Sequence, residues 1–202
     1  MKLSSRLQKF NEPETLKMAK LGRELRAKGV DVIDLSLGEP DFDTPDHVKQ
    51  FAKKAIDDNY SHYTPVAGYA DLREAVCTKL KRDNNLDYKP ENILASTGAK
   101  QSLANVILAV VDIGDEVIIP TPYWVTYSEL VRLADGKPVF VQSSIESNYK
   151  ITPEQLEAAI TPKTKLFMFS SPCNPSGSVY SREELKGLAE VFSKYPDVLI
   201  IS

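Results

Sequence analysis

Three segments of the chain carry residues that could bind a flat, phosphorylated ligand. Residues 97–100, "TGAK", open a predicted helix, and the free N–H groups and positive dipole end of a helix start suit a phosphate. Trp124 is the only tryptophan in the sequence and offers a flat ring for stacking. Asn174 stands between Pro172 and Pro175, and its carboxamide can both donate and accept hydrogen bonds. A ligand that combines a phosphate, a flat ring and polar substituents would use all three segments.

Each of these segments also has a plainer structural interpretation. The helix start matches neither the P-loop nor the G-x-G-x-x-G pattern and can be a tight turn. Trp124 can be a core residue, and Asn174 can stabilise a turn through an Asx-type hydrogen bond. Gly38, in "LGEPDF", either serves a tight turn or allows the backbone to approach a ligand closely. The binding hypothesis therefore depends on whether these residues follow strands of one sheet.

Short apolar runs alternate with helical patterns from residue 93 onward. The predicted strands are residues 93–96, 116–120, 138–142, 165–170 and 198–202. The predicted helices run from after Gly98 to Val111, from after Trp124 to near Ala134, from Pro153 to Ile160 and from Arg182 to Ser193, the last preceded by a capping box of Ser181 and Glu184. This alternation predicts an α/β domain with a mainly parallel sheet covered on both faces. Ligands of such sheets bind beyond the carboxyl ends of the strands.

The N-terminal part of the chain begins with a predicted helix from Glu14 to Lys28, which Gly29 ends. Residues 30–36, "VDVIDLS", alternate as a strand does, and Thr44 precedes a helix with Pro45 at its first position. This helix and a later one are amphipathic, and we expect both to cover the sheet. Their apolar positions are Val48, Phe51, Ala52, Ala55 and Ile56 in the first and Leu72, Ala75, Val76 and Leu80 in the second.

Composition argues against several classes of partner. The 202 residues carry a formal net charge of -3, which supplies no positive field for nucleic acid. No apolar run approaches the roughly 20 residues that a membrane-spanning helix needs, and the N-terminus lacks the apolar core of a signal peptide. Cys77 and Cys173 fall outside metal-ligand and disulfide-framework spacings. The sequence therefore predicts a cytoplasmic protein without a metal, membrane or nucleic-acid partner.

Five segments resemble the fold-type I pyridoxal phosphate aminotransferases, and specifically the bacterial aspartate aminotransferase-like branch of the class I and II family. They are "SLGEPDFDTP" at 36–45, "YTPVAGYADLREAV" at 63–76, "STGAKQSL" at 96–103, "PTPYWVTY" at 120–127 and "SPCNPSGSVYSREEL" at 171–185. They follow the family's order and spacing across nearly the whole chain. The resemblance implies a three-layer αβα large domain over residues 46–202, with an N-terminal arm and small-domain segment over residues 1–45.

The resemblance also implies how the cofactor, pyridoxal 5'-phosphate, would be held. The backbone amides of Gly98, Ala99 and Lys100 would bind its phosphate, so the Lys100 side chain is not the Schiff-base lysine. Trp124 would stack on the pyridine ring. Asn174 would hydrogen-bond the ring's phenolic oxygen and help to hold the substrate carboxylate.

Two further roles depend on the resemblance alone. Gly38 would present its backbone to the substrate carboxylate, so that substrate binding would involve Gly38, Trp124 and Asn174. Tyr63 would reach across to the phosphate in the partner subunit of a homodimer, so that the active site is shared between subunits. Cys173 stands where the family usually has asparagine, and we interpret it as a tolerated, inert neighbour.

Several residues that the family uses in catalysis are absent from these 202 residues. After the strand at 198–202 the family continues with an aspartate and a tyrosine that contact the cofactor, the Schiff-base lysine and a carboxylate-binding arginine. We therefore expect the chain to be truncated after 202, to contain no catalytic residue and to be inactive alone. The expected function is that of the N-terminal half of an aminotransferase moving an amino group from an L-amino acid, with aspartate preferred, to 2-oxoglutarate by a ping-pong mechanism. Alternatives are an aromatic, kynurenine or prephenate aminotransferase, a β-lyase of the same fold, or a binding module without cofactor.

Overall fold

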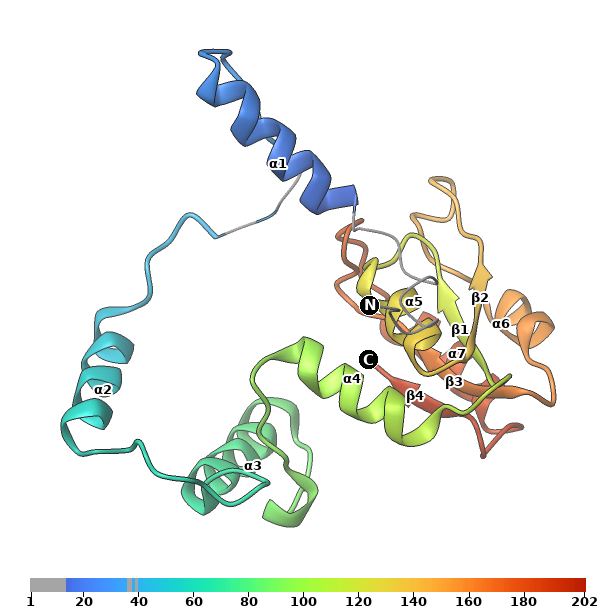
Figure 1. Cartoon of the computed structure of the whole chain (residues 1–202). Helices are drawn as coiled ribbons and strands as arrows, with labels where there is room; N and C mark the ends of the chain where they lie inside the picture. Colours follow the sequence, from blue (N-terminus) through green and yellow to red (C-terminus); the bar gives the residue numbers. More distant parts are fainter. Residues whose placement is uncertain (1–13, 36–37, 39) are drawn as a thin grey trace, which may run out of the picture. The chain divides into compact units, whose positions relative to one another are not determined.

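The computed structural model describes residues 14–35, 38 and 40–202. The chain divides into two compact units, which comprise residues 14–98 and residues 99–202 of the described part. Figure 1 shows the elements of both units along the chain. The division at residue 98 separates compact units of this chain, and the expected family domains, 1–45 and 46–202, stay a prediction.

Residues 99–202 contain a four-stranded sheet. Its strands are β1 (Glu116–Pro120), β2 (Lys137–Val141), β3 (Thr164–Met168) and β4 (Leu199–Ile201). They lie in the order β2-β1-β3-β4, and every neighbouring pair is parallel. The predicted α/β class with a parallel sheet is confirmed.

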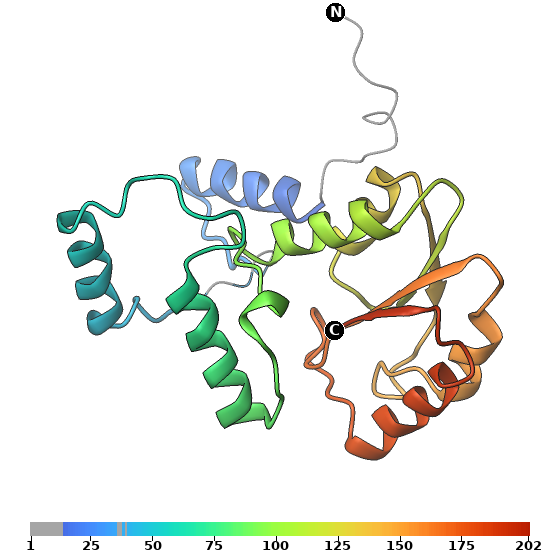
Figure 2. The same cartoon turned by 90° about the horizontal axis from the view of Figure 1, so that it is seen from below.

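Helices cover both faces of this sheet, as Figure 2 shows. They are α4 (Ala99–Val110), α5 (Thr126–Leu133), α6 (Pro153–Ala159) and α7 (Arg182–Phe192). Side chains of β1 alternate between the faces: Val117 and Ile119 pack in the cluster of α4 and α5, whereas Ile118 packs in the cluster of α6 and α7. All three are fully buried. Burial on both faces explains why the core of β1, Val117 to Ile119, is apolar at every position and does not alternate in polarity.

Local sequence fixes where α6 and α7 begin. The hydroxyl of Ser181 accepts a hydrogen bond from the Glu184 N–H (3.2 Å), and the Glu184 carboxylate accepts one from the Ser181 N–H (2.6 Å). Thr152 and Gln155 form the same reciprocal pair before α6. These capping boxes satisfy N–H groups that the first turn of a helix leaves without partners, and the box predicted for α7 is confirmed.

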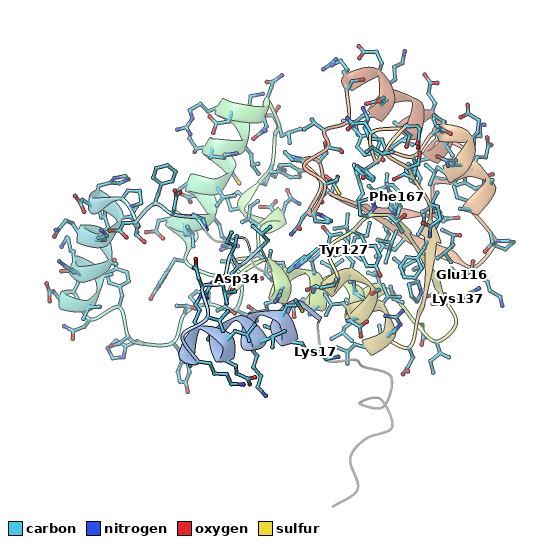
Figure 3. The ribbon with its side chains drawn as sticks, turned by 90° about the horizontal axis from the view of Figure 1, so that it is seen from above. Lys17, Asp34, Glu116, Tyr127, Lys137 and Phe167 are labelled. Carbon is cyan, nitrogen blue, oxygen red and sulfur yellow. The ribbon has the colours of Figure 1, made fainter. Side chains whose placement is uncertain are left out.

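The amino end of β1 carries a buried carboxylate. Glu116 accepts hydrogen bonds from Lys137 Nζ (2.9 Å) and Thr161 Oγ1 (2.7 Å). The hydrogen bond from Thr161 and that from Lys137 hold the pKa of Glu116 below its ordinary value. Figure 3 shows Glu116 and Lys137 side by side. This contact joins β1, β2 and the segment before β3 at the amino end of the sheet.

Residues 14–98 form a separate helical unit. Its elements are α1 (Glu14–Ala27), α2 (Asp46–Asp57), α3 (Ala70–Asn84) and the 3-10 turn η2 (Pro90–Asn92). The predicted glycine stop of α1 is confirmed, because Gly29 has a φ of +82° and its N–H donates to the Arg26 carbonyl (2.9 Å). Pro45 is the N-cap of α2 and Asp46 its first residue, so the helix begins one residue later than predicted.

Two predicted strands of this unit are absent. Residues 30–35 and 93–96 are not in strands, and Ser36, the end of the first predicted strand, lies outside the described residues. The Ala95 N–H donates a hydrogen bond to the Ala67 carbonyl (3.0 Å). A strand needs a neighbouring strand to pair its backbone groups, and the described residues of 14–98 supply none. These two predictions were wrong because an apolar run alone does not guarantee a pairing partner.

The amphipathic pattern of α2 and α3 is present, but neither helix has a buried residue. Phe51 and Ile56, on the apolar side of α2, are largely exposed. The expectation that these helices cover a sheet therefore stays a prediction.

Candidate functional site

Two loops leave the sheet side by side at its carboxyl edge. β1 ends at Pro120 and β3 ends at Met168, and the two strands are parallel neighbours. The Cys173 thiol in the second loop donates a hydrogen bond to the Pro122 carbonyl in the first (3.3 Å). The loops that carry Trp124 and Asn174 are therefore in direct contact, as expected for residues that follow strands of one sheet.

Main-chain hydrogen bonds close the loop after β3. The Cys173 N–H donates to the Ser178 carbonyl (2.9 Å), and the Gly177 N–H donates to the Cys173 carbonyl (2.8 Å). Gly177 has a φ of +74°, which favours glycine at this point. Asn174 contributes its main-chain N–H to Ser170 Oγ (3.3 Å), and the residue is exposed. The loop thus holds its own shape and presents Asn174 to solvent.

Trp124 lies next to the first turn of α4. Its ring packs edge-to-face against Tyr127, with 5.7 Å between the ring centroids. Lys100 Nζ lies 5.4 Å from the centroid of the Trp124 ring. Trp124 is half-buried, so it combines a packed side with accessible surface. The structure therefore brings the predicted phosphate-binding segment and the predicted stacking residue together.

The start of α4 has the features expected of an anion-binding helix end. Gly98 has a φ of +99°, and a Cβ there would meet no atom within 4 Å, so the backbone conformation and not crowding favours glycine. Ala99 and Lys100 are exposed. The first N–H groups of an α-helix have no acceptor within the helix, so these amides can bind an external anion.

A small apolar crevice lies beneath the two loops. Its walls include Pro122, Tyr123, Tyr149, Cys173 and Tyr180. The sequence singled out neither Tyr149 nor Tyr180. In the sequence, Tyr180 could have been noticed as a site residue only by its position, because it lies within the segment 171–185 and directly precedes the capping-box residue Ser181.

The other predicted site residues lie in the unit of residues 14–98. Gly38 and Tyr63 are exposed, and their roles stay predictions. Among the described residues, no group of three His, Cys, Asp or Glu side chains could hold a metal ion. No described helix combines the length and apolar character needed to cross a membrane.

Comparison with known proteins identifies the family. Residues 30–202 match the model of aminotransferase class I and II. The chain is 52% identical over 200 residues to the aspartate/prephenate aminotransferase of Nitrosomonas europaea, covering 99% of this chain and 50% of the relative. It is 46% identical over 202 residues to the aspartate aminotransferase of Bacillus subtilis, covering 100% of this chain and 51% of the relative. The chain thus spans about half the length of the curated relatives it matches.

Solved structures agree with this result. The aspartate aminotransferase from Rhizobium meliloti superposes with a TM-score of 0.95 at 43% identity, over 99% of this chain and 50% of that one. The aspartate aminotransferase from Thermus thermophilus with maleate gives a TM-score of 0.94 at 42% identity, over 98% of this chain and 52% of that one. The chain belongs to the class I and II aminotransferase family, in its aspartate aminotransferase-like branch.

Proposed function

We propose that this chain supplies the N-terminal half of a pyridoxal phosphate-dependent aminotransferase. The reaction would move the amino group of an L-amino acid, with aspartate preferred, to 2-oxoglutarate in a ping-pong cycle. One observation carries the proposal: the start of α4, the Trp124 loop and the Asn174 loop meet at the carboxyl edge of the sheet, through the Lys100–Trp124 and Cys173–Pro122 contacts. The names of the relatives support the choice of aspartate.

The chemistry of these groups fits pyridoxal phosphate. The exposed first turn of α4 offers main-chain donors for a phosphate, and the half-buried Trp124 offers a ring face. The exposed Asn174 offers an amide donor for a ring oxygen. These are the three kinds of group that the cofactor carries, and each has a counterpart in this one unit.

Each group would have a separate task. The amides of Gly98, Ala99 and Lys100 would hydrogen-bond the phosphate, and Trp124 would orient the ring and exclude water from one of its faces. Asn174 would donate a hydrogen bond that favours the ionised ring oxygen. When bound, the cofactor supplies an electron sink for the carbon that loses its proton. The backbone of Gly38 would bind the substrate carboxylate, and Tyr63 would reach the phosphate of a partner subunit in a homodimer.

The covalent and proton-transfer steps would depend on residues outside this chain. By the family resemblance, Lys100 would contribute its main-chain amide to the phosphate site, and its side chain would not form the Schiff base. We propose that the Schiff-base lysine, the acidic partner of the ring nitrogen and the substrate-binding arginine belong to the half of the relatives that this chain does not cover. The 202 residues alone would then be inactive, and the complete protein would be a cytoplasmic enzyme.

Prephenate is the second candidate amino acceptor. Relatives from Nitrosomonas europaea and Cereibacter sphaeroides are named aspartate/prephenate aminotransferases, at 52% and 50% identity. This favours a dicarboxylate-binding enzyme that also accepts a bulkier, ring-containing 2-oxo dicarboxylate.

The complete coding sequence that contains this chain provides the test. The purified protein should show a visible absorbance band of bound cofactor, and amino-donor profiling should rank aspartate above phenylalanine, with 2-oxoglutarate and prephenate as acceptors. A protein that shows no such band, and gains none when pyridoxal phosphate is added, would refute the proposed cofactor. A preference for aromatic donors over aspartate would refute the proposed substrate.

A further inference from the structure

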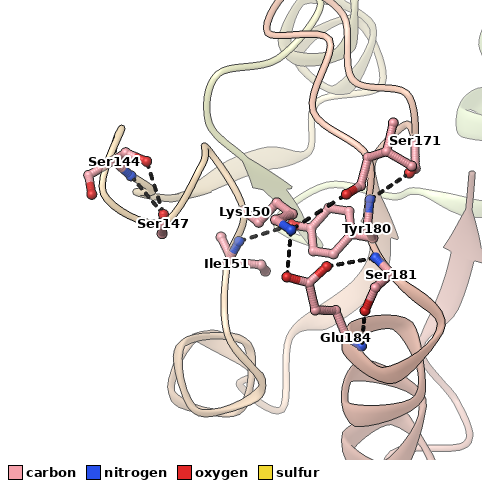
Figure 4. A network of polar contacts seen from close by, with 9 residues as sticks. Ser144, Ser147, Lys150, Ile151, Ser171, Tyr180, Ser181 and Glu184 are labelled. Atoms are coloured by element: carbon pink, nitrogen blue, oxygen red, sulfur yellow. Dashed lines mark hydrogen bonds and ion pairs between the residues drawn. The ribbon is translucent and has the colours of Figure 1, made fainter.

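A polar network joins the segment before α6 to the segment that leads into α7 (Figure 4). Lys150 Nζ lies 2.5 Å from Glu184 Oε1, and the Ile151 N–H donates to the Tyr180 hydroxyl (2.9 Å). Lys150 Nζ also donates to the Val179 carbonyl (3.5 Å) and lies 6.0 Å from the centre of the Tyr180 ring. The proposed cofactor chemistry uses none of these residues.

Tyr180 connects this network to the loop that carries Asn174. Its main-chain N–H donates to Ser171 Oγ (3.0 Å), and its ring packs edge-to-face against Phe169 with 5.7 Å between centroids. Phe169 and Ser171 precede Asn174 and Tyr180 follows it, so Tyr180 holds both ends of the loop together. The residue is only 7% exposed. Loss of its hydroxyl would leave the Ile151 N–H without this acceptor at a buried position, which is costly.

The turn that precedes Lys150 in the sequence also holds this residue in place. Asn148 and Tyr149, which precede it, have φ values of +52° and +55°, in a region that non-glycine residues seldom occupy. The Tyr149 N–H donates to the Ser144 carbonyl (2.8 Å), which closes this turn. The Lys150 side chain is 17% exposed, so its pair with Glu184 is better shielded from water than a surface pair.

We propose that Tyr180 and Lys150 are positioning residues for Asn174. They would fix the loop of residues 171–178, so that the Asn174 carboxamide is already oriented when its ligand binds. The cost of ordering the loop is then met during folding and does not reduce binding affinity. This inference rests on the proposed function, in which Asn174 hydrogen-bonds the cofactor ring and helps to hold the substrate carboxylate.

The test uses the complete, cofactor-loaded protein with Tyr180→Phe and Lys150→Met. We expect each variant to bind maleate, a dicarboxylate probe, about tenfold more weakly, which corresponds to a typical coupling between network neighbours. The pH midpoint of the cofactor's visible absorbance should rise, because a weaker hydrogen bond to the ring oxygen disfavours its ionised form. The matched control is Lys194→Met, since Lys194, just after α7, pairs with Glu157 of α6 (2.8 Å), outside the network. This control should change neither readout.

A double variant separates positioning from simple stabilisation. Tyr180→Phe should add less than about twofold to the loss of maleate affinity when Asn174 is already alanine, because effects that act through one group are not additive. A full, additive loss in that background would overturn the inference, as would unchanged maleate affinity in both Tyr180→Phe and Lys150→Met. If Asn174→Ala itself leaves maleate affinity unchanged, the proposed role of Asn174 fails, and the inference fails with it. If Tyr180→Phe does not fold, Lys150→Met provides the same comparison.

Discussion

Replacing Asn174 with alanine should separate binding from folding. Asn174 is exposed, and the hydrogen bonds that close its loop come from the main chain of Cys173 and Gly177. Its main-chain bond to Ser170 survives the substitution. Surface substitutions of this kind usually change stability by less than about 0.5 kcal/mol, so the unfolding midpoint in urea should stay nearly unchanged.

Binding should respond much more strongly. A hydrogen bond to a charged group contributes about 1.5 to 3 kcal/mol. At about 1.4 kcal/mol for each factor of ten, this predicts a loss of cofactor or dicarboxylate affinity of about 10-fold to 100-fold. The assay is equilibrium titration of the complete protein with pyridoxal phosphate and with maleate, followed by absorbance.

A matched asparagine provides the control. Asn105 is exposed on α4, so Asn105→Ala removes the same carboxamide from another surface position. We expect its affinities to equal those of the unmodified protein. Equal affinities in Asn174→Ala and Asn105→Ala would refute the reasoning and leave Asn174 as part of a turn.

Four other substitutions, one of them a control, test the fold by urea denaturation of the complete protein. Leu156→Ala should cost about 2 to 5 kcal/mol, because Leu156 is fully buried, whereas Leu185→Ala on α7 should cost clearly less; equal losses would contradict the assigned core. Ser181→Ala should cost about 0.5 to 2 kcal/mol through loss of the helix cap, and an unchanged midpoint would argue against the capping box. Glu116→Gln should destabilise the protein at neutral pH. Since the pKa of Glu116 is lowered in the folded state, its stabilising effect is present above the ordinary value of 4.5 and is lost as pH falls through the folded value. The difference from the unmodified protein should therefore shrink in acid, and a difference that is constant with pH would contradict this.

The sheet of residues 99–202 could be predicted because its strands carry a strong signal. The core of β1, Val117 to Ile119, is apolar at every position because helices bury both of its faces. The run at 93–96 has a similar composition but no strand beside it among the described residues. Composition alone shows that a run is apolar, whereas its burial and its pairing depend on segments distant in the sequence.

The site could be predicted only in part for a related reason. Gly98, Trp124 and Asn174 stand at strand or helix boundaries, where an unusual residue type attracts notice. Tyr180 carries no such signal, because its hydroxyl partner Ile151 lies 29 residues away. Long-range hydrogen bonds of this kind become visible only once the fold is known.

A crystal structure of the complete protein with pyridoxal phosphate would test the central claim most directly. We predict that the amides at the start of α4 contact the phosphate, that the Trp124 ring lies against the cofactor ring, and that the Asn174 carboxamide donates to its phenolic oxygen. A cofactor bound away from these three segments, or contacting only one of them, would contradict the claim.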